Sequence, residues 1–279
     1  MVDIAADYSP VGSTGVEVFR TYRGRMTAIP RSHEAEAFLE ALQDTAPDVV
    51  TACDGWTTHE ITAHLAAAAA EITRHLHYYV RGEAVPATRS FEEREAPYQA
   101  MDDKALRQRL ESEEGRMRSM IDQALEREPE AVIPWTGRQM VVAKFIPHMR
   151  NEFAIHRWDF AGDDEVGREL LGQPELTEHA VGVLGEILVR RGWGQDPYPD
   201  EDFQVRLRAD RGKDVRLVVE SGHAGLQLAE DSSDEPYVEL DAAARTLVLW
   251  GRRPDERGRF RSHLPASMLA RLQALLAGY

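Results

Sequence analysis

Residues 148–159 read HMRNEFAIHRWD, and this stretch decides the fold that the sequence predicts. Phe153 and Trp158 belong to a mostly apolar segment, as expected of a helix that packs into a protein core. Glu152 and His156 stand four residues apart, which places both side chains on one face of such a helix. On a solvated helix this spacing is common and has no function. If the face points inward, a buried carboxylate and imidazole need polar partners, and one metal ion would satisfy both.

Two ligands from one helix do not make a tight transition-metal site, so a third ligand is expected from another segment. The candidate is His64, in the stretch GWTTHEITAHLAAAAAEI at residues 55–72. Two histidines and one glutamate, with a fourth position open, have the composition of a catalytic zinc site. The sequence therefore predicts that His64, Glu152 and His156 bind zinc or another divalent metal.

Other residues near His64 offer competing ligand pairs. Glu60 is also four residues from His64, but Thr57 and Glu60 fit a capping box at the start of a helix, so Glu60 is left out of the site. Glu71 and His75 lie further along the same face, where a solvated pair is favoured over a pocket lining.

Composition excludes several classes of function. The chain has 279 residues, of which 43% are hydrophobic and 29% charged, as in soluble globular proteins. A formal net charge of −15 argues against nucleic acid or an anionic membrane as partner. No stretch resembles a signal peptide or a transmembrane helix, and the single Cys53 suits a reducing cytoplasm. If the protein performs thiol chemistry, the thiol is expected to come from a substrate rather than from Cys53.

Hydrophobic periodicity predicts an α+β protein in which a four-helix bundle precedes a small α/β domain. The bundle helices are expected at residues 32–44, 57–82, 102–128 and 141–161, with a fifth helix at 177–191. The stretch GWGQDPYPD at residues 192–200 is the expected boundary, and alternating strands at 203–207 and 215–219 follow it. The predicted parts are an N-terminal arm (1–28), the bundle (29–195) and the α/β domain (196–279).

Three motifs carry a resemblance to a known family: GW(x)7HL at 55–65, NExxxHxxD at 151–159, and LVLWGRR at 247–253. In this order they resemble the mycothiol-dependent maleylpyruvate isomerase family, over residues 31–277. The resemblance implies a DinB-like metal-binding bundle followed by a domain related to sterol-carrier proteins. It also implies mycothiol as co-substrate, and a metal held by His64, Glu152 and His156. Cys53 and Asp54 stand where the family pattern has a proline, a departure that concerns substrate choice.

The expected function is that of a zinc-dependent mycothiol S-transferase, in which a metal-bound thiolate attacks a small electrophile. The alternatives are a maleylpyruvate-type cis–trans isomerase, a metal-dependent hydrolase of thiol conjugates, and a non-catalytic binding protein. The expected partners are small molecules, and the chain is a monomer or homodimer.

Four further residues are assigned roles around the expected metal. Asp159 follows His156 by nearly one turn and either accepts its imidazole N–H or is exposed at the helix end. Arg252 and Arg253 either bind a substrate or cofactor carboxylate or form a solvated pair at a helix C-terminus. His148 is one turn before Glu152, where it reaches the cofactor pocket without being a metal ligand.

Overall fold

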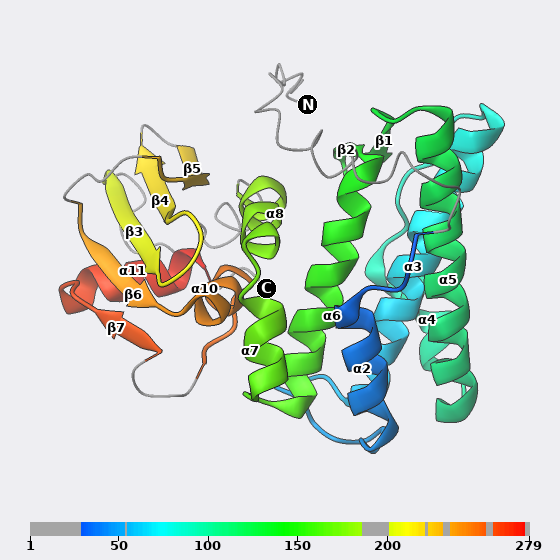
Figure 1. Ribbon diagram of the computed structural model, residues 1–279, viewed down its shortest axis with the longest axis horizontal. Coiled ribbons are helices and arrows are strands. Elements are labelled where there is room, and N and C mark those ends of the chain that lie inside the picture. Colours follow the sequence, from blue (N-terminus) through cyan, green and yellow to red (C-terminus); the bar gives the residue numbers. More distant parts are fainter. Residues whose placement is uncertain are drawn as a thin grey trace.

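The computed structural model describes residues 29–53, 55–185, 201–220, 223–230, 235–254 and 259–276. The predicted N-terminal arm and the predicted boundary at 192–200 lie outside these residues. Long helices lie side by side on one side of the molecule and a sheet lies on the other, with helices α7 and α8 between them (Figure 1). The predicted fold class, an N-terminal helical region followed by a mixed domain, is confirmed.

The four predicted bundle helices are present. They are α2 (His33–Gln43), α3 (Thr58–Arg81), α5 (Asp103–Arg127) and α6 (Phe145–Ala161). Helix α3 starts at the expected capping box: Thr57 Oγ1 accepts the Glu60 backbone N–H, and the Glu60 carboxylate accepts the Thr57 backbone N–H. It ends at Gly82, whose φ of 72° lies in the left-handed region that favours glycine.

Helix α6 follows a single 3-10 turn, η1 (Val142–Lys144). Pro147 therefore falls in the first turn of α6, where its missing N–H removes no helical hydrogen bond. The apolar face of α6 packs on α2, and the rings of Phe153 and Phe38 meet edge to face at 5.5 Å. This packing turns the opposite, polar side of α6 toward α3.

The prediction from the sequence missed or misplaced several shorter helices and strands. Helix α4 (Phe91–Gln99) and helix α7 (Glu165–Leu171) were not predicted, and α8 (Pro174–Leu184) starts earlier than expected. Pro174 occupies the first turn of α8, a position that suits proline. The extended piece predicted at 131–138 is part of a hairpin, formed by β1 (Val132–Trp135) and β2 (Arg138–Val141).

The second part of the chain forms a five-stranded sheet in the order β5-β4-β3-β6-β7. Its strands are β3 (Phe203–Ala209), β4 (Val215–Glu220), β5 (His223–Leu228), β6 (Tyr237–Leu240) and β7 (Phe260–Ser262). Strands β3 and β6 pair in parallel, and the other neighbours are antiparallel. The strands expected at 203–207 and 215–219 are thus present as β3 and β4, and the short edge strand β7 was missed. Helices α10 (Ala242–Leu249) and α11 (Ala266–Leu275) complete this part.

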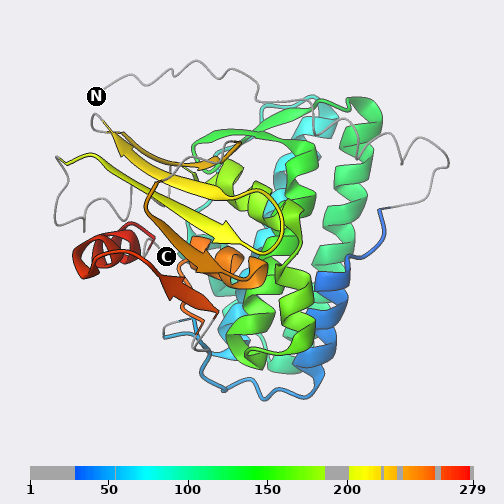
Figure 2. The ribbon, with the colours of Figure 1, turned by 60° about the vertical axis from the view of Figure 1, so that its left-hand side comes forward.

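Helix α10 packs against α7 and α8, which joins the sheet domain to the bundle (Figure 2). At this junction the Trp250 indole N–H donates to Asn151 Oδ1 at 3.1 Å, and the hydroxyls of Thr177 and Thr246 lie 3.1 Å apart. Buried polar contacts of this kind fix the relative position of two packed elements. Among the described residues, no helix has the length and apolar character needed to cross a membrane.

Candidate metal centre

Helices α3 and α6 bring the three predicted ligands together. Ligand atoms of His64, Glu152 and His156 all lie within 4.8 Å of one another. His64 Nε2 is 3.4 Å and His156 Nε2 is 3.6 Å from the same oxygen, Glu152 Oε2. The exposed fraction of the side chain is 10% for His64, 8% for His156 and 11% for Glu152. Their convergence is the geometry that the sequence predicted, and their role as metal ligands remains a prediction.

The outer nitrogen of each histidine contacts a carboxylate. His64 Nδ1 lies 2.7 Å from Glu95 Oε1, and His156 Nδ1 lies 2.8 Å from Asp159 Oδ2. Because an ionised carboxylate only accepts hydrogen bonds, each Nδ1 carries a proton, and each Nε2 is the nitrogen that faces Glu152 and would bind a metal through its lone pair. Carboxylate partners of this kind are typical of metal-bound histidines. The donor set therefore fits a divalent metal such as zinc.

Asp159 connects the centre to the sheet domain. Arg252 Nε and Nη2 donate to the two carboxylate oxygens of Asp159 at 2.9 Å and 2.7 Å, and Arg252 Nη1 donates to the carbonyl of Trp250 at 3.1 Å. Asp159 is buried, so the alternative of an exposed helix-end residue is wrong. The side chain accepts from His156, as predicted, because the sheet domain covers this end of α6.

The structure places Arg252 and Arg253 differently from each other. Arg252 was expected to bind a carboxylate of the substrate, but in the structure Asp159 occupies its guanidinium. Arg253 is exposed, and both arginines line a cavity of about 180 Å³ in the sheet domain. Their roles toward substrate or cofactor remain predictions.

Hydrogen bonds at the centre stabilise the charged forms of His64 and Glu152 against the effect of burial. Burial lowers the pKa of His64, but hydrogen bonds to Glu152 and Glu95 outweigh it and raise that pKa above its ordinary value. Burial raises the pKa of Glu152, yet hydrogen bonds from His156 and His64 hold it well below its ordinary value. A carboxylate that stays ionised while facing two imidazole nitrogens is suited to hold a cation.

Aromatic rings form the walls of the centre. The Trp56 ring stacks on the His156 ring, with centroids 6.2 Å apart and an interplanar angle of 7°. Phe91 of α4 stacks on His64 at 5.9 Å and is 47% exposed. In the sequence, Trp56 stood out only as part of the GW motif, and Phe91 and Glu95 were missed. The GW motif was a signal for Trp56, and the capping box of Ser90 and Glu93 was a signal for the start of α4 that sequence reasoning did not use.

His148 lies beside the centre, as predicted. Its Nε2 is 3.9 Å from Glu152 Oε1, and its Nδ1 is 3.4 Å from Nε2 of His179 on α8. Burial lowers the pKa of His148 and lowers that of His179 further. Both rings are therefore neutral at physiological pH, and a cofactor-binding role of His148 remains a prediction.

Glu71 and His75 are not the solvated pair that the sequence favoured. Both side chains are fully buried. Glu71 accepts hydrogen bonds from Arg74 and Arg89, and His75 Nδ1 lies 3.0 Å from the carbonyl of Pro134. The expectation was wrong because the hairpin β1–β2 and the segment before α4 cover this part of α3.

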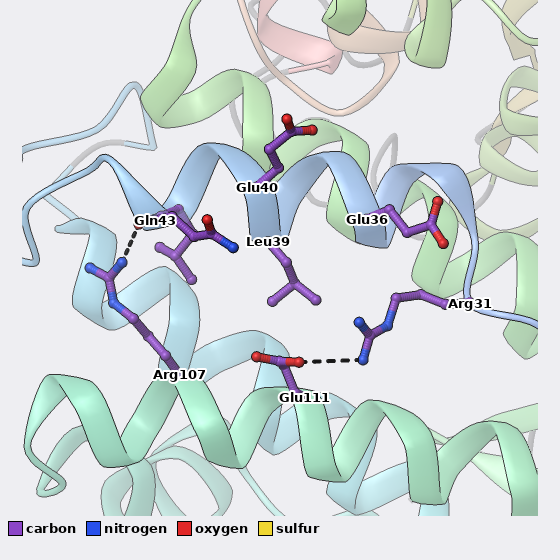
Figure 3. Close-up of a pocket in the computed structure, with 8 residues that line it drawn as sticks. Arg31, Glu36, Leu39, Glu40, Gln43, Arg107 and Glu111 are labelled. Atoms are coloured by element: carbon purple, nitrogen blue, oxygen red, sulfur yellow. Dashed lines mark hydrogen bonds and ion pairs between the residues drawn. The ribbon is translucent and has the colours of Figure 1, made fainter.

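A groove of about 460 Å³ lies apart from the centre, between α2 and α5 (Figure 3). It is lined by charged side chains such as Arg31, Glu36 and Glu111, and Arg31 pairs with Glu111 at 3.7 Å. None of the residues of the metal centre lines this groove.

The fold and the three converging side chains define a helical bundle with a candidate metal centre, joined to a small mixed domain. Residues 31–161, slightly less than half of the chain, match the family described as mycothiol maleylpyruvate isomerase N-terminal domain. This match confirms the resemblance seen in the sequence motifs.

Two solved structures resemble the chain over most of its length. One is the crystal structure of the mycothiol-dependent maleylpyruvate isomerase, with a TM-score of 0.55 and 18% identity, covering 80% of this chain and 86% of that one. The other is a mutant of that isomerase in which a histidine is replaced by alanine, with a TM-score of 0.53, 17% identity and the same coverage of 80% and 86%. At these identities the likeness is one of fold. No curated protein matches the chain by sequence.

Proposed function

We propose that this protein is a metal-dependent enzyme that uses mycothiol to act on a small electrophilic substrate. The observation that carries the proposal is the convergence of His64, Glu152 and His156, with both histidine Nε2 atoms facing one carboxylate oxygen. The sequence favoured thiol transfer. The match of residues 31–161 to the isomerase family supports cis–trans isomerisation of a maleylpyruvate-like acid as the reaction to test first.

When bound, a divalent metal would lower the pKa of a thiol and provide a thiolate at neutral pH. The chain prepares the site for it. Glu95 and Asp159 keep the histidine protons on Nδ1, and the rings of Trp56 and Phe91 stack on the two imidazoles. Arg252 offsets the charge of Asp159, so that the buried carboxylate stays ionised.

Both reactions begin with the same step. The thiolate forms an S–C bond to a conjugated double bond, and the π electrons move onto the substrate carbonyl. In an isomerisation, the substrate rotates about the C–C bond that was the double bond. Loss of the thiolate then restores the double bond, so no atoms are gained or lost. In a transfer reaction, the S–C bond is kept, and the carbanion takes up a proton or expels a leaving group.

Metal content tests the centre directly. Protein purified without added metal should carry close to one divalent ion per chain, and Glu152→Gln or His156→Ala should remove it without changing the helical circular dichroism signal. His64→Ala and His77→Ala form a matched pair on α3, because His77 is exposed on the same helix. Retention of metal by His64→Ala, or its loss in His77→Ala, contradicts the assignment.

Product analysis with and without mycothiol then separates the reactions. Isomerisation returns the thiol unchanged, transfer gives a thioether, and a hydrolase gives product without any thiol. Cys53→Ser should keep the activity, because the attacking thiol is supplied by the co-substrate. A cytoplasmic location, small-molecule partners and zinc as the native metal remain predictions.

A further inference from the structure

Helix α4 packs on α3 beside the metal centre. Within α4, only Arg94 and Glu95 are buried. Glu95 is 4% exposed, and its Oε1 lies 2.7 Å from His64 Nδ1. Phe91, at the start of α4, stacks its ring on the same imidazole, with the two ring centroids 5.9 Å apart. Two residues of α4, Phe91 and Glu95, therefore contact the same predicted metal ligand.

Helix α4 depends on such contacts for its order. It has nine residues and contains Pro97, and a helix of this length is not stable by itself in water. Its two ends are attached to α3: Arg89, just before α4, pairs with Glu71 at 2.7 Å, and His59 Nε2 lies 3.2 Å from the carbonyl of Gln99. Between these anchors, Glu95 accepts the hydrogen bond of His64 Nδ1 from the middle of the helix, next to the buried Arg94.

We propose that Glu95 positions His64 for metal binding, and that metal binding in turn holds α4 on the centre. Glu95 accepts the Nδ1 proton and so leaves the Nε2 lone pair for the metal. A cation on Nε2 makes the Nδ1–H group a stronger donor, which strengthens its bond to the buried carboxylate. Because linkage is reciprocal, the factor by which the metal stabilises the docked helix equals the factor by which docking increases metal affinity.

This inference rests on the metal centre proposed above, and metal affinity tests it without any activity assay. Zinc affinity is measured by competition with a chromophoric chelator for wild type, Glu95→Ala, Glu95→Gln and Glu92→Gln. Glu95→Ala should bind zinc roughly 10–100-fold more weakly than wild type, the usual effect of losing such a partner. Glu95→Gln should lose less, because its amide oxygen still accepts from Nδ1. The control Glu92→Gln changes an exposed carboxylate of the same helix and should bind as wild type does.

Hydrogen exchange followed by mass spectrometry tests the coupling. Zinc should slow exchange of the backbone amides at 91–99 in wild type and Glu92→Gln, and should have no such effect in Glu95→Ala. Equal zinc affinity of Glu95→Ala and wild type, or equal zinc-dependent protection of α4 in both, overturns the inference and leaves the metal centre in place. If wild type binds no zinc, the metal centre itself is wrong. Should Glu95→Ala not fold, a wild-type zinc affinity of Glu95→Gln together with unchanged α4 protection counts against the inference.

Discussion

The pair of Asp159 and Arg252 joins the end of α6 to the sheet domain, and replacing Arg252 with Met tests its contribution. The Asp159 side chain is fully buried and that of Arg252 is 9% exposed. Two hydrogen bonds, of 2.9 Å and 2.7 Å, connect them. Burial raises the pKa of Asp159, but hydrogen bonds from Arg252 and His156 hold it below its ordinary value. In Arg252→Met, the carboxylate stays buried with only the histidine as partner.

Removing one partner of a buried ion pair costs about 3–5 kcal/mol, because the other charge is left without compensation. We expect a value near the lower limit, about 3 kcal/mol, since His156 still donates to Asp159. For a chain of this size, that corresponds to a fall of roughly 6–12 °C in the unfolding temperature. In the double variant Asp159→Asn/Arg252→Met neither charge of the pair remains buried. Its loss of unfolding free energy should therefore be smaller than the sum of the losses in the two single variants.

The assay is urea unfolding of the metal-free proteins, followed by circular dichroism, so that metal affinity does not contribute. Arg253→Met is the matched control, because the neighbouring arginine is exposed, and it should stay within about 0.5 kcal/mol of wild type. Equal midpoints for Arg252→Met and Arg253→Met would refute the reasoning. Strict additivity in the double variant would show that the two side chains do not act as a pair.

Three further predictions concern α3 and the junction. Thr57→Ala removes the N-cap of α3 and should cost about 1 kcal/mol, measured by urea unfolding. Burial raises the pKa of Glu71, but hydrogen bonds from His75 and two arginines outweigh it and lower that pKa below 4.5. Its stabilisation is therefore present above that pH and is lost on acidification, so the stability difference between wild type and Glu71→Gln should shrink from about pH 6 to about pH 3; a constant difference contradicts this. Trp250→Phe loses the bond to Asn151 and should destabilise by about 1–3 kcal/mol, and an unchanged unfolding midpoint would speak against a contribution of this bond.

Local rules of the sequence predicted the elements that carry the centre. The capping box at Thr57 and the glycine at position 82 marked both ends of α3, because helix ends are satisfied by residues next to them in the chain. The spacing of Glu152 and His156 placed both side chains on one face of α6, since an α-helix repeats every 3.6 residues. The prediction that His64 joins this pair was based on residue types and the order of the motifs. The structure brings the three side chains together.

Other features of the centre depend on contacts between segments far apart in the chain. Glu95 reaches His64 from 31 residues away, and Arg252 reaches Asp159 from 93 residues away. Helix α4 has a local signal at its start, the capping box of Ser90 and Glu93, but no apolar period that would show which of its faces packs inward. The burial of Glu71 was also hidden, because the segments that cover it are not its neighbours on α3. Helix periodicity and capping act within a few residues and can be seen in a sequence, whereas burial and the partner of a charge are set by whichever distant segment packs against it.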